Sequence, residues 1–228
     1  MKGLHNLFNL FYPPICICCD TKLLDQESHI CLECRMDLPF VDNLNYQSNP
    51  LTEIFEGRVS IENGGAFLYY TQLGKVKKII HELKYKGNQM IGVFFGHWFG
   101  QQLLESKHFS TIDYIIPVPL HSKKLRQRGY NQLTKFGEIL ETILSTTYSE
   151  EILQRVSSAK TQTFKKRLER FNNQDSKFVV NDLTILENKH ILLIDDVVTT
   201  GATLEACCLE LEKVKNLKIS IITMALTQ

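Results

Sequence analysis

The sequence lacks a hydrophobic run long enough to cross a bilayer, which takes about 20 apolar residues, so no transmembrane span is expected. It also lacks an excess of either charge: 26 lysines and arginines stand against 25 acids in 228 residues, a net charge of +1. This balance excludes a protein that binds nucleic acid through bulk basic charge, and any electrostatic function must come from local clusters. With 43% hydrophobic and 22% charged residues, the composition is that of a soluble globular protein.

Neither a signal peptide nor a disulfide framework is expected. The opening stretch MKGLHNLFNLFYPP has apolar residues at helical spacing and no small-residue cleavage site, which predicts a short amphipathic helix. We expect this helix to dock on the protein itself, with contact to a membrane surface as the alternative. The cysteines number seven, an odd count that argues against paired disulfides and favours a reducing, cytoplasmic location.

Four of these cysteines form the pattern C-x2-C-x11-C-x2-C: Cys16, Cys19, Cys31 and Cys34. Each C-x2-C pair places two thiolates on one side of a tight turn, and two pairs complete the tetrahedral four-sulfur shell typical of structural zinc. Zinc would also supply folding energy that so short a segment lacks. The alternatives are a degenerate site or a redox pair, and Cys18 could replace a neighbouring ligand. Cys207 and Cys208 lie in a predicted helix, where we expect ordinary buried residues.

Beyond residue 45, short apolar runs alternate with apolar residues at helical spacing. The runs predict strands at 65–70, 113–120, 190–196 and 217–226. The helical spacing predicts helices at 73–83, 90–104, 130–143 and 202–214. This alternation indicates an α/β fold with a mainly parallel sheet flanked by helices. We therefore expect a small cysteine-rich module in residues 1–45 and an α/β domain in residues 46–228.

The stretch HILLIDDVVTTGAT, residues 190–203, ends a buried apolar run on two adjacent acids, Asp195 and Asp196. Open α/β sheets bind their ligands at the carboxyl ends of the strands. Two acids at the end of a buried strand are costly unless a ligand needs them. Because carboxylates are hydrogen-bond acceptors, vicinal sugar hydroxyls are natural partners, and Mg²⁺ bound with a phosphorylated sugar would offset the charge. The acids therefore indicate a site for a sugar phosphate.

The residues that follow the acids are small and rich in hydroxyls: Thr199, Thr200, Gly201, Ala202 and Thr203. They lead into a predicted helix, whose first N–H groups and dipole favour an anion. Gly201 allows the backbone to approach closely, and the threonine hydroxyls can donate hydrogen bonds. The stretch could hold a ribose by its hydroxyls and a 5′-phosphate by the loop. The alternative, an acid-capped strand before a threonine-rich helix start, explains neither the paired acids nor their spacing to Gly201.

The segment ILLIDDVVTTGAT resembles the phosphoribosyl-pyrophosphate (PRPP) binding motif of type I phosphoribosyltransferases. PVPLHSKKLRQRGYNQ (117–132) and TQTFKKRLERFNN (161–173) are similar to the ComF family, also called the competence protein F or GntX-type family, and KYKG (84–87) is a weaker match. A four-cysteine zinc finger ahead of a phosphoribosyltransferase-like domain is the layout of that family. The resemblance covers nearly the whole chain and implies a type I phosphoribosyltransferase-like fold.

The resemblance implies two further loops. A pyrophosphate loop would contain Arg126, Arg128 and Gly129, with a solvated basic turn as the alternative. A mobile loop that closes over the ligand would contain Thr161, Gln162, Arg167 and Arg170, with an exposed charged helix as the alternative. The family usually has a glycine-leucine pair two residues after the glutamine, where this chain has Phe164 and Lys165. This departure puts the conformation of the mobile loop in doubt.

A basic cluster precedes these segments in the sequence: Lys75, Lys77, Lys78, Lys84 and Lys86. Tyrosines lie near the cluster, and basic residues interleaved with aromatic ones suit single-stranded nucleic acid. Solvated lysines on a helix face are the reading that we favour.

The resemblance implies a cytoplasmic factor of natural transformation that binds PRPP or a phosphoribosyl group, handles incoming single-stranded DNA and contacts proteins of the DNA-uptake machinery. Two alternatives stay open: an active phosphoribosyltransferase that releases pyrophosphate with an unknown acceptor, and a PRPP-sensing regulator. No segment matches a nucleobase pocket. Whether the chain is an enzyme is therefore left open, while structural zinc and Mg²⁺ with PRPP are the expected cofactors.

Overall fold

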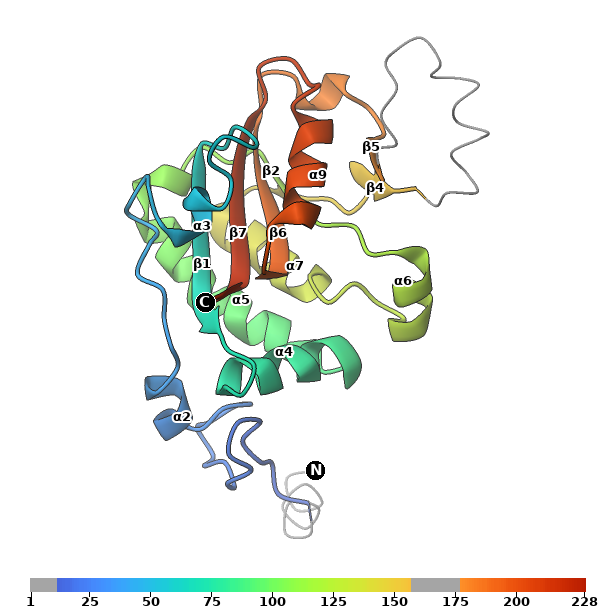
Figure 1. Ribbon diagram of the computed structural model, residues 1–228. Helices are drawn as coiled ribbons and strands as arrows, with labels where there is room; N and C mark the ends of the chain where they lie inside the picture. The colour runs from blue at the N-terminus through green and yellow to red at the C-terminus, as the bar shows by residue number, and fades with distance from the viewer. Residues whose placement is uncertain (1–11, 157–176) are drawn as a thin grey trace.

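A five-stranded parallel sheet crosses the computed structural model, which describes residues 12–156 and 177–228 (Figure 1). Its strands in spatial order are β1 (Asn63–Tyr70), β7 (Lys218–Thr227), β6 (His190–Val198), β2 (Tyr114–Pro117) and β3 (Thr147–Tyr148). Strands covered on both faces are apolar almost throughout, which is why β6 and β7 appear in the sequence as continuous apolar runs. The expected mainly parallel sheet is confirmed, and its four long strands are those that the sequence predicts.

Three helices cover one face of the sheet: α4 (Lys75–Tyr85), α5 (Met90–Glu105) and α7 (Thr134–Leu144). α5 and α7 pack closely because α5 carries glycines at the contact. A Cβ on Gly96 would lie 2.8 Å from the Cβ of Ile139, and one on Gly100 would lie 2.7 Å from Cδ1 of Ile143. Only glycine permits such an approach. α5 thus packs one side against the sheet and α7, while His97, Gln101 and Glu105 on its other side are exposed.

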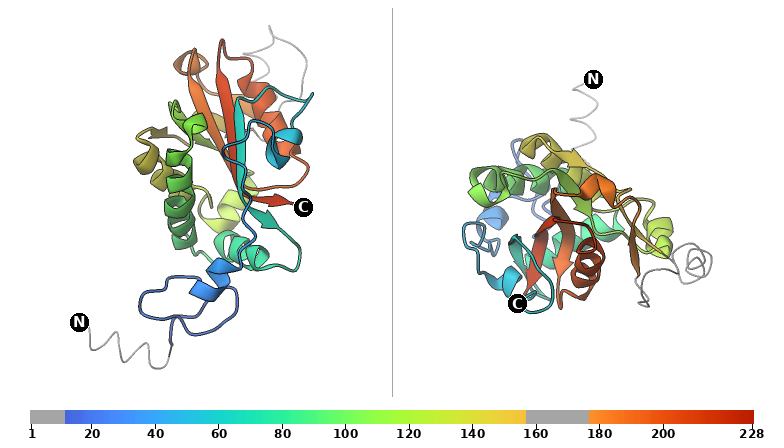
Figure 2. Two further views of the ribbon diagram at one scale, coloured as in Figure 1. Left: turned by 90° about the vertical axis from the view of Figure 1, so that its left-hand side faces the viewer. Right: turned by 90° about the horizontal axis from the view of Figure 1, so that it is seen from above.

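The opposite face is covered by α9 (Ala202–Leu211), by the short helix α3 (Pro50–Glu53), and by an antiparallel hairpin of β4 (Leu153–Arg155) and β5 (Phe178–Val180). Figure 2 shows the sheet between this layer and the helices of the other face. Burial of the sheet on both sides leaves its carboxyl edge as the place where polar side chains can gather.

The cysteine-rich segment contains α2 (Leu32–Met36) and lies beyond the carboxyl end of β1, next to α4 (Figure 1). Its buried residues belong to the same apolar core as α4 and α5. The boundary expected near residue 45 stays a prediction. The amphipathic helix expected in residues 1–11 lies outside the described residues. Within residues 12–156 and 177–228, none of the helices combines the length and apolar character that a membrane crossing requires.

Several short elements escape the sequence patterns: α6 (Ser122–Arg128), the 3-10 turns Lys107–Phe109 and Thr184–Leu186, and the two-residue strand β3. They are too short for an apolar period to show. Two predicted helices also begin later than their spacing indicates. Leu73 is fully exposed ahead of α4, and Tyr130 precedes α7.

Candidate functional site

Asp195 and Asp196 lie near the carboxyl end of β6, although the strand continues through them to Val198 rather than stopping there. Successive residues of a strand point to opposite faces, so the two carboxylates diverge. Asp196 is 4% exposed. Its Oδ1 lies 2.7 Å from Nζ of Lys84 at the end of α4, and its Oδ2 accepts a hydrogen bond from the side-chain amide of Gln132. Oδ1 of Asp195 accepts a hydrogen bond from the backbone N–H of Asp196 at 2.8 Å.

The acidity of Asp195 is strongly perturbed. Burial, and after it the charge of Asp196, raise the pKa of the Asp195 carboxyl from 3.8 to about 8, while Lys84 and Lys124 act in the opposite direction. Carboxyls with such perturbations gather at functional sites, where a ligand provides the compensation that the fold does not. The carboxyl edge of β6 therefore has the electrostatic character of a ligand site.

The loop after β6 has a backbone conformation suited to an anion. Gly201 has a φ of +74°, which glycine adopts readily, and a Cβ there would lie 2.7 Å from Cγ2 of Ile54. α9 begins at the next residue, and Gly201 offers no capping side chain. The N–H of Ala202 makes a long contact of 3.5 Å with Oγ1 of Thr200, and the N–H groups that follow it in the first turn are the ones suited to an anion. Three hydroxyl-bearing residues of the loop are exposed: Thr199, Thr200 and Thr203.

Arg58 fixes this loop from outside. Its Nη1 donates hydrogen bonds to the carbonyl oxygens of Thr200 and Ile54, both at 2.9 Å, and its Nη2 pairs with Glu205 in the first turn of α9. Arg58 was not expected from the sequence, because it belongs to no motif. Its role depends on bringing together segments that are far apart in the chain.

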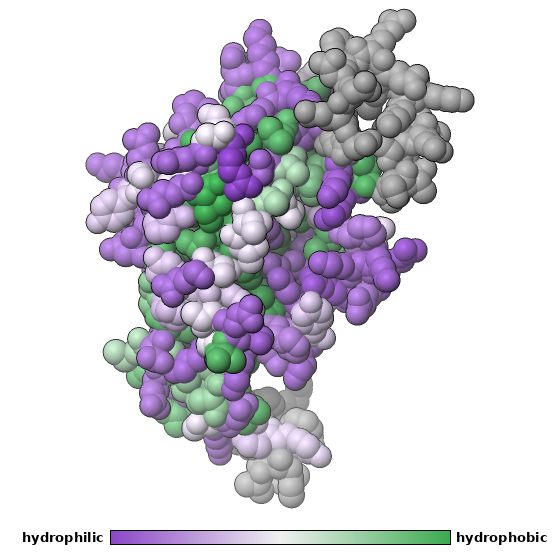
Figure 3. All heavy atoms as spheres, viewed as in Figure 1, coloured by the Kyte–Doolittle hydropathy of each residue, from purple (hydrophilic) through white to green (hydrophobic). Residues whose placement is uncertain are grey.

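The arginines expected in a pyrophosphate loop lie instead on the short helix α6, which Gly129 ends with a φ of +77°. None of the residues of α6 is buried, and Figure 3 shows hydrophilic side chains over this part of the surface. Arg126 is exposed, and in residues 12–156 and 177–228 its side chain has no hydrogen bond or ion pair. α6 is therefore an exposed basic helix, and its role as a pyrophosphate loop stays a prediction.

Arg128, by contrast, is connected to the paired acids. Its Nη1 donates a hydrogen bond to Oε1 of Gln132 at 2.6 Å, and the same Gln132 side chain binds Asp196. The Arg128 guanidinium also lies over the ring of Tyr85, 5.0 Å from its centroid. The structure thus brings Arg128 to the acids through Gln132.

Two residues of this site, Lys84 and Gln132, were not among the expected ligand-binding residues. Both lie in the stretches KYKG and PVPLHSKKLRQRGYNQ, so family resemblance was the available signal. The expected mobile-loop residues lie outside the described residues: Thr161, Gln162, Arg167 and Arg170.

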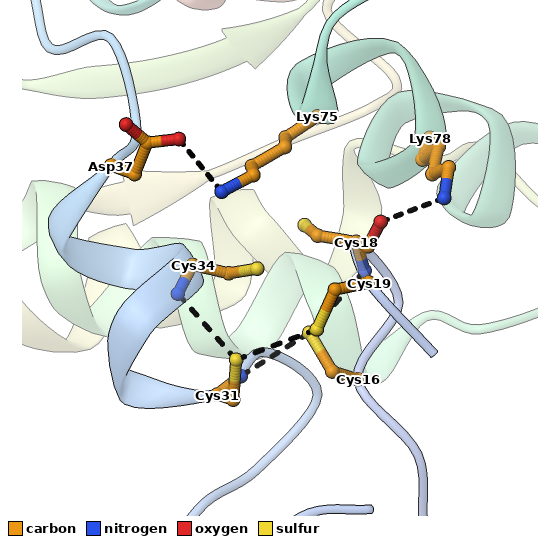
Figure 4. A network of polar contacts seen from close by, with 8 residues as sticks. All are labelled: Cys16, Cys18, Cys19, Cys31, Cys34, Asp37, Lys75 and Lys78. Atoms are coloured by element: carbon orange, nitrogen blue, oxygen red, sulfur yellow. Dashed lines mark hydrogen bonds and ion pairs between the residues drawn. The ribbon is translucent and has the colours of Figure 1, made fainter. Parts of the chain in front are cut away.

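The four cysteines of the C-x2-C pairs come together as predicted: Cys16, Cys19, Cys31 and Cys34 (Figure 4). Their Sγ atoms all lie within 4.8 Å of one another, and those of Cys19 and Cys31 are 3.7 Å apart. Four sulfurs about 2.3 Å from a tetrahedral zinc lie roughly 3.8 Å apart, so the spacing fits the metal. Backbone N–H groups of Cys18 and Cys31 point at Sγ of Cys16, each at 3.4 Å. The thiol of Cys18 is not part of the cluster.

Lysines of α4 hold this cysteine module in place. Nζ of Lys75 lies 2.7 Å from Oδ2 of Asp37, and Nζ of Lys78 donates a hydrogen bond to the carbonyl oxygen of Cys18 at 2.7 Å (Figure 4). These two charges are used in docking the module. They do not form an open groove for nucleic acid together with Lys84, which is paired with Asp196.

Comparison with known proteins gives the site a context. A model described as phosphoribosyl transferase domain matches residues 135–227, which include the paired acids and the 199–203 loop. Over 216 residues the chain is 29% identical to competence protein ComFC of Bacillus subtilis, covering 92% of this chain and 83% of that protein. Over 128 residues it is 28% identical to DNA utilization protein YhgH of Escherichia coli O157:H7, covering 55% of this chain and 56% of that protein. Competence protein F of Haemophilus influenzae is 34% identical over 94 residues, which is 40% of each.

Among solved structures, adenine phosphoribosyltransferase from Saccharomyces cerevisiae is 15% identical with a TM-score of 0.37, covering 61% of this chain and 72% of that chain. This likeness is too low to support an argument. The matched phosphoribosyl transferase domain follows a four-cysteine cluster that lies ahead of the sheet in the chain. By these matches the chain is similar to proteins of the ComF family, and its match to a phosphoribosyl transferase domain lies behind an N-terminal four-cysteine cluster.

Proposed function

We propose that the chain binds PRPP, or another phosphoribosyl group, with Mg²⁺ at the carboxyl edge of β6, and that it handles incoming single-stranded DNA in natural transformation. One observation supports this ligand: Asp195 and Asp196 lie near the carboxyl end of β6, just before the loop in which Gly201 leads into α9, whose start has no side-chain cap. Carboxylates accept hydrogen bonds from ribose hydroxyls, and the N–H groups of a helix start bind phosphate. The role in competence follows the printed names of the relatives.

Each part of the ligand would have its own partners. Asp195 and Asp196 would bind the ribose hydroxyls, and residues 199–203 would bind the 5′-phosphate. Arg126 and Arg128 would bind the pyrophosphate group, since guanidinium groups match phosphate oxygens in pairs. Mg²⁺ bound with the ligand would offset the charge of the pyrophosphate. Structural zinc would be held by the four cysteines and would stabilise the module.

The surface that best suits single-stranded DNA is α6. It carries Lys123, Lys124 and Arg126, contains no acid, and buries none of its residues. Tyr85 lies beside it through the contact with Arg128, and this residue is 61% exposed, which offers a stacking surface for a base. The cysteine module would be free to dock a protein of the DNA-uptake machinery. We place this activity in the cytoplasm, where the thiols stay reduced.

Phosphoribosyl transfer is the second candidate, and the matched domain model favours it. In that reaction the bond between C1′ and the pyrophosphate oxygen breaks, and pyrophosphate leaves with the electron pair. An acceptor then bonds to C1′ through a lone pair and releases its proton to solvent. The chain would contribute by holding the ribose, compensating the charge of the leaving group and excluding water. A PRPP-sensing regulator would bind the same ligand without releasing pyrophosphate.

The experiment for the ligand is calorimetric titration of the zinc-loaded protein with PRPP and Mg²⁺, alongside the Asp195→Asn/Asp196→Asn double variant. Loss of two hydrogen bonds to charged groups should weaken binding by about 100-fold or more. Absence of binding by the folded wild-type protein would defeat the proposal for this site. Pyrophosphate release measured with candidate acceptors then separates an enzyme from a regulator.

The DNA role needs a separate measurement, because it could hold even if the ligand site failed. Binding of a labelled single strand should weaken steeply as salt is raised, since phosphate contacts displace counterions. An affinity that is negligible at low salt, or that does not change with salt, would show that the basic residues of α6 are ordinary surface.

A further inference from the structure

Asp196 is held on both of its carboxylate oxygens by the protein itself. Oδ1 receives the ammonium of Lys84 at 2.7 Å, and Oδ2 receives the side-chain amide of Gln132. The Asp196 side chain is 6% exposed and that of Lys84 is 21% exposed. These are contacts of a largely buried group, and they come from two elements far apart in the sequence.

The two donors are themselves fixed. Gln132 accepts a hydrogen bond from Nη1 of Arg128 at 2.6 Å, so its amide can turn only its N–H groups toward Asp196. The end of α4 is tied to the same segment, because the hydroxyl of Tyr130 donates a hydrogen bond to the carbonyl oxygen of Leu83 at 2.6 Å. Lys84 and Gln132 thus contact Asp196 from positions that other hydrogen bonds fix.

These contacts determine how many hydrogen bonds Asp196 can still accept. A carboxylate has about four lone-pair positions, and two of them are occupied here, so two acceptor positions remain. The positive charge of Lys84 compensates a carboxylate that would be costly to bury alone. Asp196 is therefore kept as an acceptor of fixed orientation, which is the group that a pair of neighbouring hydroxyls requires.

We propose that Lys84 and Gln132 are positioning residues that hold Asp196 for the ribose diol, so that the site accepts ribose phosphates and discriminates against 2-deoxyribose phosphates. The inference rests on the proposed phosphoribosyl site and names its substrate class. A 2-deoxyribose lacks one of the two hydroxyl donors and leaves an acceptor of a buried carboxylate unpaired. It follows that the deoxyribose phosphates of DNA are not the ligands of Asp196.

The test compares two probes, ribose 5-phosphate and 2-deoxyribose 5-phosphate, by calorimetry on the zinc-loaded full-length chain. Wild type should prefer the ribose compound by about 10- to 100-fold, the value of one hydrogen bond to a charged group. Lys84→Gln should lose most of this preference through weaker binding of ribose 5-phosphate alone, and Lys84→Arg should retain part of it. Lys77→Gln is the matched control, since Lys77 is an exposed lysine on the same helix.

Gln132→Met provides a second variant of similar shape in case Lys84→Gln does not fold, and it should lose the preference in the same way. Equal weakening of both sugars in Lys84→Gln would overturn the inference, because it would mean that Lys84 contacts the phosphate. An unchanged preference in Lys84→Gln and Gln132→Met would overturn it as well. If wild type binds PRPP but does not discriminate between the two sugars, the inference fails while the proposed function stands. If wild type binds none of these ligands, the proposed function fails first.

Discussion

Replacing Gly201 by alanine should destabilise the protein through two separable effects. The residue has a φ of +74°, and holding an alanine in the left-handed region costs about 1–2 kcal/mol. The new Cβ would also lie 2.7 Å from Cγ2 of Ile54 and 3.0 Å from Cε1 of Phe55, both in packed side chains. Overpacking of this kind costs roughly 1–3 kcal/mol. The expected total loss is about 2–5 kcal/mol of unfolding free energy.

The matched control is Gly57→Ala. Gly57 has a φ of +69°, and a Cβ built on it meets no atom within 4 Å, so only the conformational cost applies. The assay is urea unfolding followed by circular dichroism, with the midpoints compared at constant slope. Equal losses in the two variants would refute the steric part of the reasoning. A further check is Gly201→Ala in an Ile54→Ala background, where the cost should shrink because the opposing methyl group is gone.

Three further predictions follow from the contacts around the two candidate sites. Removal of zinc by a chelator should detach the cysteine module. The guanidinium of Arg35 in this module lies 4.9 Å from the ring centroid of Trp98, the single tryptophan, so the fluorescence emission of Trp98 should shift. Emission that stays constant while four thiols become titratable would contradict this docking. The raised pKa of Asp195, from 3.8 to about 8, means that the folded protein keeps a proton which the unfolded chain has lost, so this group makes the unfolding free energy fall as pH rises through that range. Asp195→Asn should flatten the pH profile, and identical slopes in both proteins would refute the assignment. Replacing Lys123 and Lys124 by alanine should weaken binding of single-stranded DNA and lower the salt slope by about 1.4, and an unchanged slope would remove α6 from the interface.

The sequence was sufficient for features that depend on near neighbours in the chain. The apolar runs of β6 and β7 follow from burial of the sheet on both faces, which leaves few polar positions to obscure the pattern. The paired C-x2-C turns predicted the cysteine cluster for the same reason, since each turn brings two sulfurs together by itself. Short elements such as α6, with seven residues, and β3, with two, were missed because they are too short for a repeating apolar pattern to show.

The sequence by itself determined a parallel α/β sheet, a four-cysteine cluster, and an acidic pair followed by a glycine at the start of a helix. The tertiary structure alone decided which cations serve which acids: Lys84 neutralises Asp196, while Lys75 on the same helix docks the cysteine module. The physical reason is that helix and strand patterns record which face is buried, whereas the partner of a buried charge depends on how distant elements meet. Lysines of one basic cluster in the sequence, such as Lys75 and Lys84, therefore contact different parts of the molecule and have different roles.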